Sequence, residues 1–342
     1  MRSSFVALIV SAAVLFIGCS SAPAASQAPV TLRLGYFPNV THAAAVVGVA
    51  KGIYQDAFGA NVTLEPKTFN AGPDAIEALL SGGLDATFIG PNPAINAFEK
   101  SSGAAIRIIS GATSGGAYLV VRDGINAPAD LKGTKIASPQ LGNTQDVALR
   151  SWLASQGLTS DAQGGGDVSV VPQSNSQTLE TFVSKQIDGA WVPEPWATRM
   201  IKDGGGHVLV DERSLWPNAQ YVTTHLIVAT TFLQQHPDVV KQLIQGHLNA
   251  TDYVNNNTAD AQTTLGTAIN TLTGSTLSPD VISSSWQNLT FTMDPIAASL
   301  QSSADAAKSL GFLTSSDLKG IYDLTLLNEV LTAAGRPTIA QP

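Results

Sequence analysis

The sequence is poor in cysteine and in charged residues. Its only cysteine among 342 residues is Cys19, so neither an intrachain disulfide nor a thiolate metal cluster can form. Charged residues make up 13%, about half the usual share, which excludes a coiled coil and a disordered charged tail. The formal net charge is -8, whereas a nucleic-acid binder needs basic residues that neutralise phosphates. We therefore expect no nucleic-acid partner.

Long apolar runs are also absent, apart from one at the N-terminus. Residues 5–17 are almost entirely apolar, too few to span a bilayer but enough for a signal peptide. The run ends before Cys19, and this junction resembles a bacterial lipobox. We expect residues 1–18 to be a signal peptide and 19–29 a lipidated tether, so that the exported protein is periplasmic or anchored to the outer face of the cell membrane. The alternative is ordinary signal-peptide cleavage within residues 22–25.

The rest of the chain alternates short strand patterns with helical patterns. Such alternation over short loops predicts an α/β fold with largely parallel sheets. From residue 231 the pattern is helical to the end. Strands are expected at 31–37, 61–65, 85–89, 106–109, 117–121, 135–138, 168–171, 188–191, 208–210 and 221–229. Helices are expected between them at 41–51, 74–81, 94–100, 143–156 and 177–185.

The length and the order of these patterns predict two lobes. Lobe 1 would hold residues 30–115 and 222–342, with the helical C-terminal part packed on it, and lobe 2 would be the insertion 116–221. The chain would cross between the lobes near 111–117 and return near 216–225. Ligand sites lie at the carboxyl ends of parallel strands, so we expect a ligand cleft between the lobes.

Four polar turns join an expected strand to an expected helix. Helix N-termini present unpaired N–H groups and a partial positive charge, and several on one cleft would hold a small anion. The alternative is that each polar side chain only caps its own helix. The candidate ligand-binding residues of these turns are Asn39, Thr41, His42, Asn70, Gly90, Pro91, Asn92, Gln140, Gly142, Asn143 and Thr144. Gly116, at the first crossing, is a further candidate.

The segment from Trp191 to Trp196 holds two aromatic rings and a carboxylate between prolines. Trp191 would give an organic ligand an apolar face, while Trp196, on the following helix, is the better candidate for the core. Glu194 would contact either the ligand or the other lobe.

Catalytic and metal sites lack a pattern of their own. The histidines are scattered without a thiolate partner, and the sequence has no phosphate-binding loop of the Gly-x-x-x-x-Gly-Lys type. The pattern around Ser114 fails as a nucleophile elbow because its first position is Ala112. We expect no catalytic residue, no metal and no cofactor.

Several of these segments together resemble the solute-binding proteins of ABC importers. The motifs that carry the resemblance are residues 35–42, 77–85, 90–94, 130–133, 138–146 and 191–196. They are similar to the nitrate, sulfonate, taurine and bicarbonate branch with the type II periplasmic-binding fold, and they come in the family order. The resemblance implies binding turns at Asn39, Gly90–Asn92, Gly142–Thr144 and Trp191.

The resemblance also implies a function and partners. The protein would capture a small organic anion and deliver it to an ABC permease and ATPase complex, as a monomer. An aliphatic sulfonate is the first choice, and nitrate, bicarbonate and thiamine precursors stay open. The alternative function is an enzyme of the same fold, related to pyrimidine-precursor synthases.

Overall fold

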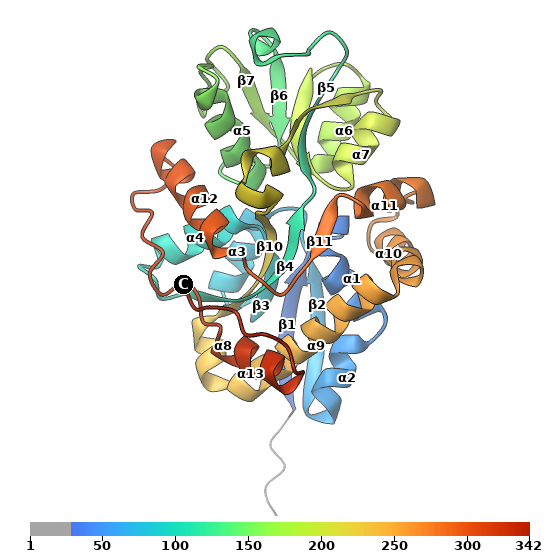
Figure 1. Cartoon of the computed structure of the whole chain (residues 1–342), viewed down its shortest axis with the longest axis vertical. Coiled ribbons are helices and arrows are strands. Elements are labelled where there is room, and N and C mark those ends of the chain that lie inside the picture. Colours follow the sequence, from blue (N-terminus) through green and yellow to red (C-terminus); the bar gives the residue numbers. More distant parts are fainter. Residues whose placement is uncertain (1–28) are drawn as a thin grey trace, which may run out of the picture.

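A computed structural model of the chain describes residues 29–342, so the expected signal peptide and Cys19 lie outside the described residues. Two mixed sheets form the centres of two lobes (Figure 1). The first sheet has the order β11-β4-β10-β3-β1-β2, and the second has the order β7-β6-β8-β5-β9. The strands are β1 (Val30–Tyr36), β2 (Val62–Thr68), β3 (Ala86–Ile89), β4 (Ile106–Gly115), β5 (Ala117–Val121), β6 (Lys135–Ser138), β7 (Ser169–Pro172), β8 (Gly189–Pro193), β9 (His207–Asp211), β10 (Val222–Ala229) and β11 (Leu289–Phe291).

The chain passes between the two sheets twice. It leaves the first sheet at the end of β4 and enters the second at β5, and it returns between β9 and β10. We use lobe 1 for residues 30–115 and 222–342, and lobe 2 for residues 116–221. Because β4 runs toward lobe 2 and β10 runs back from it, their pairing is antiparallel.

The expectation of largely parallel sheets is therefore only partly correct. Strand β1 pairs in parallel with β2 and β3, and β6 pairs in parallel with β7 and β8. Strands β10 and β5 pair antiparallel with their neighbours, since they carry the chain into or out of the other lobe.

Helices cover both faces of each sheet, and one group comes from the C-terminal third of the chain (Figure 1). In lobe 1 they are α1 (Ala43–Ala50), α2 (Ile53–Phe58), α3 (Gly72–Leu80) and α4 (Pro91–Lys100); in lobe 2 they are α5 (Thr144–Ser155), α6 (Asn175–Val183) and α7 (Trp196–Lys202). The C-terminal helices are α8 (Thr230–Gln235), α9 (Pro237–Asn256), α10 (Thr258–Thr273), α11 (Pro279–Trp286), α12 (Ala297–Ser309) and α13 (Thr325–Ala333). Short 3-10 helices are η1 (Val40–His42), η2 (Gly59–Asn61), η3 (Pro128–Leu131), η4 (Glu212–Leu215) and η5 (Pro217–Ala219).

The C-terminal helices pack mainly on lobe 1, as expected, but not only there. Helix α9 packs on α1 and α2, and α13 packs on α9. Helix α11 also contacts α7 of lobe 2, and α12 contacts α5 of lobe 2. The C-terminal part therefore bridges the two lobes (Figure 1).

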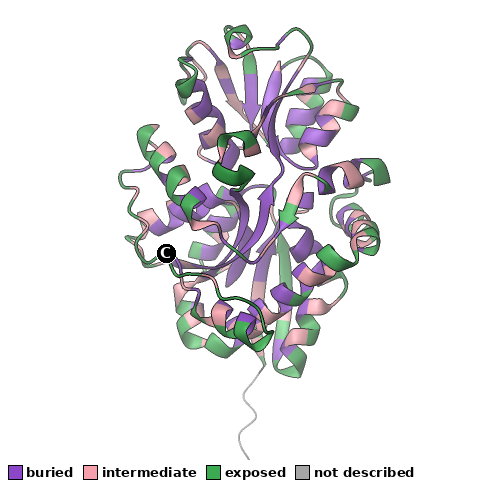
Figure 2. Ribbon diagram, viewed as in Figure 1, coloured by how far each residue is buried: buried purple, intermediate pink, exposed green. Residues whose placement is uncertain are grey.

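Buried residues concentrate along both sheets and along the helix faces that cover them (Figure 2). One large apolar cluster fills lobe 1, and two smaller clusters lie in lobe 2. Within residues 29–342, no helix is long and apolar enough to cross a membrane.

Candidate functional site

A small cavity lies between the lobes, at the ends of strands from both sheets. Its volume is about 30 Å³. Strands β1, β3, β6 and β8 all end at it, as expected for a site at carboxyl strand ends. The residues that line this central cavity are Phe37, Asn39, Thr41, His42, Asn70, Ala71, Gly90, Pro139, Asn143, Thr144, Gln145, Asn175, Pro193, Thr223 and Thr224.

Helix starts surround the central cavity. The residue before η1, Asn39, and the residues before α3, α4 and α5 — Ala71, Gly90 and Asn143 — all line it. Asn175, the first residue of α6, lines it as well. The first N–H groups of a helix have no partner within the helix, and the helix dipole makes that end positive. This arrangement can hold a small anion without a cationic side chain.

The residues that line the central cavity carry no formal charge. Among residues 29–342, no Lys, Arg, Asp or Glu lines this cavity. Burial lowers the pKa of His42 to about 3, so this imidazole is neutral at pH 7. Its Nδ1 accepts a hydrogen bond from the Phe37 N–H at 3.4 Å, which leaves Nε2–H as the donor of the ring. His42 can therefore offer an anion a hydrogen bond but no charge.

Two buried polar atoms beside the central cavity have no partner. Within the part of the chain that the structure describes, Thr144 Oγ1 and Asn175 Oδ1 make no hydrogen bond, although the exposed fractions of these residues are only 6% and 8%. Buried polar groups are rarely left unpaired in a folded protein, and exceptions gather at functional sites. The Thr144 hydroxyl can donate to an anion, so it is a natural ligand contact.

The helix starts of the two lobes approach each other closely at this point. A Cβ atom added to Gly90 of lobe 1 would lie 2.5 Å from Thr144 Oγ1 of lobe 2. Trp196 Nε1 of lobe 2 donates to Asn39 Oδ1 of lobe 1 at 3.0 Å. The central cavity is thus built from both lobes.

A buried ion pair supports the lobe 2 turn. Asp146 accepts from the Gly142 N–H at 2.9 Å and from the Ser138 hydroxyl at 2.6 Å. Arg150 pairs with the same carboxylate at 3.1 Å, and both charged side chains are almost fully buried. The Asp146 carboxylate thereby ties the end of β6 to the start of α5 and fixes the position of Thr144.

The structure corrects the expected roles of the two tryptophans. Trp191 is fully buried in the lobe 2 core, and its Nε1 donates to Glu212 Oε2 at 2.7 Å. It does not line the central cavity, and its ring packs against Trp152 with centroids 6.0 Å apart. Trp196, expected in the core, instead lines a neighbouring cavity of about 310 Å³ and reaches Asn39.

Glu194 lies at a contact between the lobes. It is 1% exposed and does not line the central cavity. Asn288 Nδ2 donates to its Oε1 at 2.7 Å, and Ser285 Oγ donates to its Oε2 at 3.1 Å. Thr198 adds bonds from its N–H and hydroxyl, so both carboxylate oxygens are used within the protein. Burial raises the pKa of Glu194, and these hydrogen bonds oppose the rise.

Some other expected site residues also lie outside the central cavity. Pro91 and Asn92 line a separate cavity of about 410 Å³. There Asn92 Nδ2 donates to the Ser303 carbonyl at 3.4 Å. Gln140 and Gly142 belong to the turn that positions Thr144, rather than to the cavity wall. Gly116 lies at the first crossing.

Sequence reasoning missed several lining residues. Asn175 follows the end of β7 and starts α6, which is the same strand, polar turn and helix arrangement as the four turns that were recognised. That signal was present and could have identified it. Thr223 and Thr224 lie at the start of an antiparallel strand, where a rule about parallel strand ends gives no indication.

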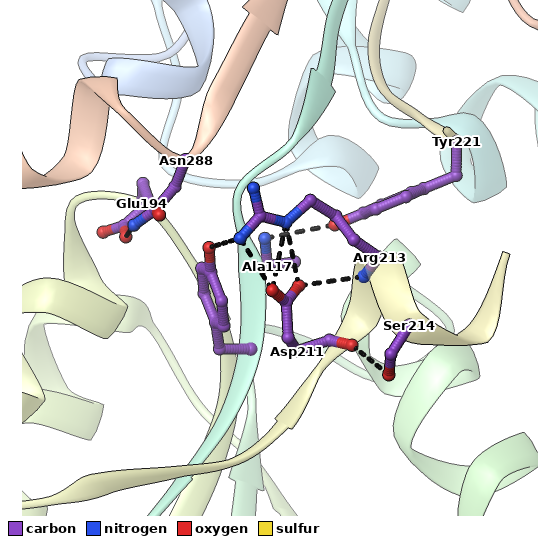
Figure 3. Close-up of polar contacts among 8 residues, drawn as sticks. Ala117, Glu194, Asp211, Arg213, Ser214, Tyr221 and Asn288 are labelled. Atoms are coloured by element: carbon purple, nitrogen blue, oxygen red, sulfur yellow. Dashed lines mark hydrogen bonds and ion pairs between the residues drawn. The ribbon is translucent and has the colours of Figure 1, made fainter. Parts of the chain in front are cut away.

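The two crossings are held by polar contacts (Figure 3). Arg213 pairs with Asp211 at 2.7 Å and donates to the Tyr118 hydroxyl at 3.2 Å. The Ala117 N–H donates to the Tyr221 hydroxyl at 3.1 Å, which joins the outgoing strand to the returning one. The contact between Glu194 and Asn288 lies beside them in Figure 3. These contacts join the two chain segments that connect the lobes.

The sequence model of one family, described as the NMT1-like family, matches residues 25–268, which is most of the chain. The chain belongs to the NMT1-like family. A relative from Brucella abortus, described as a binding protein, is 27% identical to this NMT1-like chain over 65% of its length and 72% of the relative. The taurine-binding periplasmic protein of Escherichia coli is 26% identical over 55% of this chain and 56% of that protein.

Solved structures show the same fold. The alkanesulfonate-binding protein from Xanthomonas axonopodis pv. citri, solved with bound MOPS, has a TM-score of 0.70 and 22% identity. The similarity covers 85% of this NMT1-like chain and 96% of that protein. The two-lobed type II periplasmic-binding fold expected from the sequence is confirmed.

Proposed function

We propose that this protein is the solute-binding protein of an ABC importer and that it captures a small organic anion and delivers it to the permease. The observation that carries this proposal is the uncharged central cavity surrounded by helix starts from both lobes. Backbone N–H groups and the Thr144 hydroxyl would bind the anion. The relatives described as binding proteins support the same role.

An aliphatic sulfonate is the preferred ligand class. A sulfonate has three oxygens that point in different directions and one organic substituent. The helix starts approach from both lobes, so they offer donors from several directions, and Thr144 also lines a cavity of about 410 Å³ that has room for the substituent. Nitrate and bicarbonate have no such substituent.

Ligand binding would draw the lobes together by a hinge motion. The central cavity has walls from both lobes, so an anion there would contact both at once. The crossings at Gly115–Ala117 and Asp211–Val222 would absorb the change in angle. A closed, liganded form is what the permease would then recognise, and we expect the protein to act as a monomer.

The proposal includes export and a lipid anchor at Cys19. A Cys19→Ala variant should leave the membrane fraction and appear in the soluble fraction when cells are fractionated. Retention of that variant in the membrane fraction would contradict lipidation at Cys19.

The central experiment is isothermal calorimetry on the mature protein. The panel is an alkanesulfonate series, taurine, nitrate, bicarbonate, phosphonates and thiamine precursors. We expect a sulfonate to bind best, and at 100 times its Kd it should add about 2.7 kcal/mol to the free energy of unfolding. Tighter binding of nitrate or bicarbonate than of any sulfonate would refute the ligand class. Conversion of a bound ligand to a new product would favour the enzyme alternative.

A further inference from the structure

A second cavity shares a wall residue with the central one. It has a volume of about 410 Å³ and lies between α5 and the η4–η5 segment of lobe 2, the start of α4 and helix α12 of lobe 1. Thr144, whose hydroxyl has no partner, lines both cavities. We call this second space the side cavity.

Aromatic rings form part of the side-cavity wall. Trp152, Trp216 and Tyr221 line it. The rings of Trp216 and Tyr221 are stacked, with centroids 5.6 Å apart and an interplanar angle of 14°. The electron-rich face of an indole ring attracts an organic cation.

One carboxyl group, that of Glu212, also lines the side cavity. Glu212 is 3% exposed, and its Oε2 accepts from Trp191 Nε1 at 2.7 Å. No Lys or Arg is among the described residues that line this cavity. The neighbouring Arg213 turns to Asp211 and Tyr118 instead. Glu212 is thus a buried carboxyl with no cationic partner of its own.

A buried carboxylate without a counter-charge is costly, which makes a cationic ligand group the partner it lacks. Burial raises the pKa of Glu212 to about 7, as expected for a carboxyl that no cation balances. The N–H groups of Trp191 and Trp216 oppose this rise in the pKa only in part.

The cavity of about 310 Å³ that Trp196 lines, next to the central cavity, has a cationic group in its wall where the side cavity has a carboxyl group. It is lined by Arg199, whose guanidinium lies 5.3 Å from the Trp196 ring centroid, and by no carboxylate. An organic cation would be repelled there. Glu194, the other buried glutamate of this region, has both oxygens occupied by protein donors.

We propose that the side cavity is a subsite for an organic ammonium group, which is carried by the same ligand whose anionic end occupies the central cavity. Glu212 pairs with the ammonium, and Trp216 and Trp152 provide the aromatic faces beside it. Residues of both lobes line the side cavity, so the ammonium adds to the closure that the anion starts. This inference rests on the proposed function, because it takes the anion site as given.

The test compares matched ligands by calorimetry. Unsubstituted alkanesulfonates of two to five carbons are measured beside their ω-amino counterparts, and free alkylamines form a third arm. One aminosulfonate of the series should bind at least roughly tenfold more tightly than its unsubstituted partner, as a hydrogen-bonded charge pair warrants. The length at which this preference peaks reports the span between the two cavities.

Two variants and a control locate the ammonium. Glu212→Gln keeps the side-chain size and an acceptor for Trp191, and it should abolish the amino preference, so that each aminosulfonate and its unsubstituted partner bind within about twofold of each other. Trp216→Leu should weaken the amino ligands more than their unsubstituted partners, because the substituents of both series lie in the side cavity that Trp216 lines. Glu180→Gln removes one exposed lobe 2 charge and should change neither ligand series. Ligand-induced quenching of tryptophan fluorescence is a second readout, and thermal melting checks that each variant folds.

The outcomes separate the two proposals. Binding of alkanesulfonates with no amino preference, or an amino preference that survives Glu212→Gln, overturns the ammonium subsite and leaves the proposed function intact. Binding of a free alkylamine as tightly as the best aminosulfonate overturns the claim that one ligand spans both cavities. Failure of every sulfonate to bind contradicts the proposed sulfonate ligand itself.

Discussion

At the scale of single residues, the lining of the central cavity combines side chains that build the turn with side chains that we propose as ligand contacts. Asn143 Oδ1 accepts from the Thr144 N–H at 2.8 Å, so Asn143 caps its own helix. Thr144, the next residue, has a hydroxyl with no partner. For Asn143 the structure bears out capping, which the sequence analysis kept as the alternative to ligand binding.

Thr144→Val should weaken anion binding by roughly tenfold or more, because it removes one donor to a charged group without a large change in volume. Thr144→Ser keeps the hydroxyl and should stay within about threefold of the wild type. Calorimetry with a simple alkanesulfonate measures both. Thr267→Ala is the control, since that hydroxyl bonds only within α10. Equal affinities for the valine and serine variants would contradict a ligand role for the hydroxyl.

The pH dependence of stability tests the environment of Glu212. Its pKa is about 7 in the folded state against an ordinary 4.5, so between these values the folded protein binds more protons than the unfolded chain. Glu212 therefore costs stability increasingly as pH rises from 4.5 to 7. The nearby titratable groups are Asp211, which raises this pKa, and Tyr221, which stays neutral because burial raises its own pKa.

Glu212→Gln should consequently be more stable than the wild type by about 1–3 kcal/mol at pH 8, and the gain should shrink toward zero near pH 4.5. Urea unfolding at several pH values measures the difference. Buried histidines such as His247 titrate alike in both proteins and cancel. If the gain in stability of Glu212→Gln over the wild type were the same at all pH values, folding would not raise the pKa of Glu212.

The sequence predicted only part of the candidate site, for reasons that particular residues make plain. Asn39, His42, Asn143 and Thr144 were found because polar turns at strand ends have a recognisable composition. Trp191 was misplaced because the groups that enclose its ring, Trp152 and Glu212, come from distant segments and leave no local pattern. The two candidate roles of Glu194 stayed open, because a contact between distant segments leaves no local pattern.

At the scale of elements, the order of strands and helices was predictable up to α12, with the exception of α2, β11 and the short 3-10 helices. Most of these elements are identified by their hydrophobic periodicity, which is about two residues in a strand and about 3.6 residues in a helix. Strand β11 was missed because three residues are too short to show a period, and residues 316–324 were wrongly expected to be helical. Strand β11, at the edge of the first sheet, forms because it pairs with β4 and not because of a pattern in its own sequence.

The first crossing depends on two consecutive glycines with positive φ. Gly115 has φ +82°, and a Cβ atom there would lie 2.7 Å from the backbone oxygen of Asn288. Gly115→Ala should therefore lower the free energy of unfolding by backbone strain of about 1–3 kcal/mol and by steric overlap in addition. Gly124→Ala is a matched control, since Gly124 has φ +94° and no neighbour within 4 Å. Denaturant unfolding gives the loss in free energy of unfolding for each variant, and the difference between the two losses isolates the steric overlap. Equal losses would show that the crossing tolerates a side chain.

At the scale of the whole molecule, the C-terminal part connects the lobes at two places. Helix α12 meets α5, and α11 meets α7, on opposite flanks of the hinge (Figure 1). The second connection contains both a buried and an exposed charged contact. Glu194 binds Ser285 and Asn288 in the interior, while Lys202 pairs with Asp280 at 2.5 Å on the surface.

Both contacts join the same two regions, since Glu194 lies two residues before α7 and Asn288 lies two residues after α11. They therefore provide an internal comparison. Glu194→Ala leaves the half-buried amide of Asn288 without its partner, which costs about 1–3 kcal/mol. The Ser285 hydroxyl keeps its hydrogen bond to the Val281 carbonyl at 2.7 Å. If the contact holds the closed arrangement, this cost falls on the closed form and lowers the fraction of protein that is competent to bind. The apparent Kd rises in inverse proportion to that fraction.

We therefore expect Glu194→Ala to weaken sulfonate binding by roughly tenfold or more and to increase the radius of gyration measured by small-angle X-ray scattering. Lys202→Ala removes an exposed ion pair worth at most about 1 kcal/mol and should change affinity less than about fivefold. Scattering with saturating ligand should bring both variants back to the closed dimensions, because bound anion contacts both lobes. Unchanged affinity and dimensions in Glu194→Ala would mean that this contact does not hold the lobes together and that closure depends on the central cavity alone.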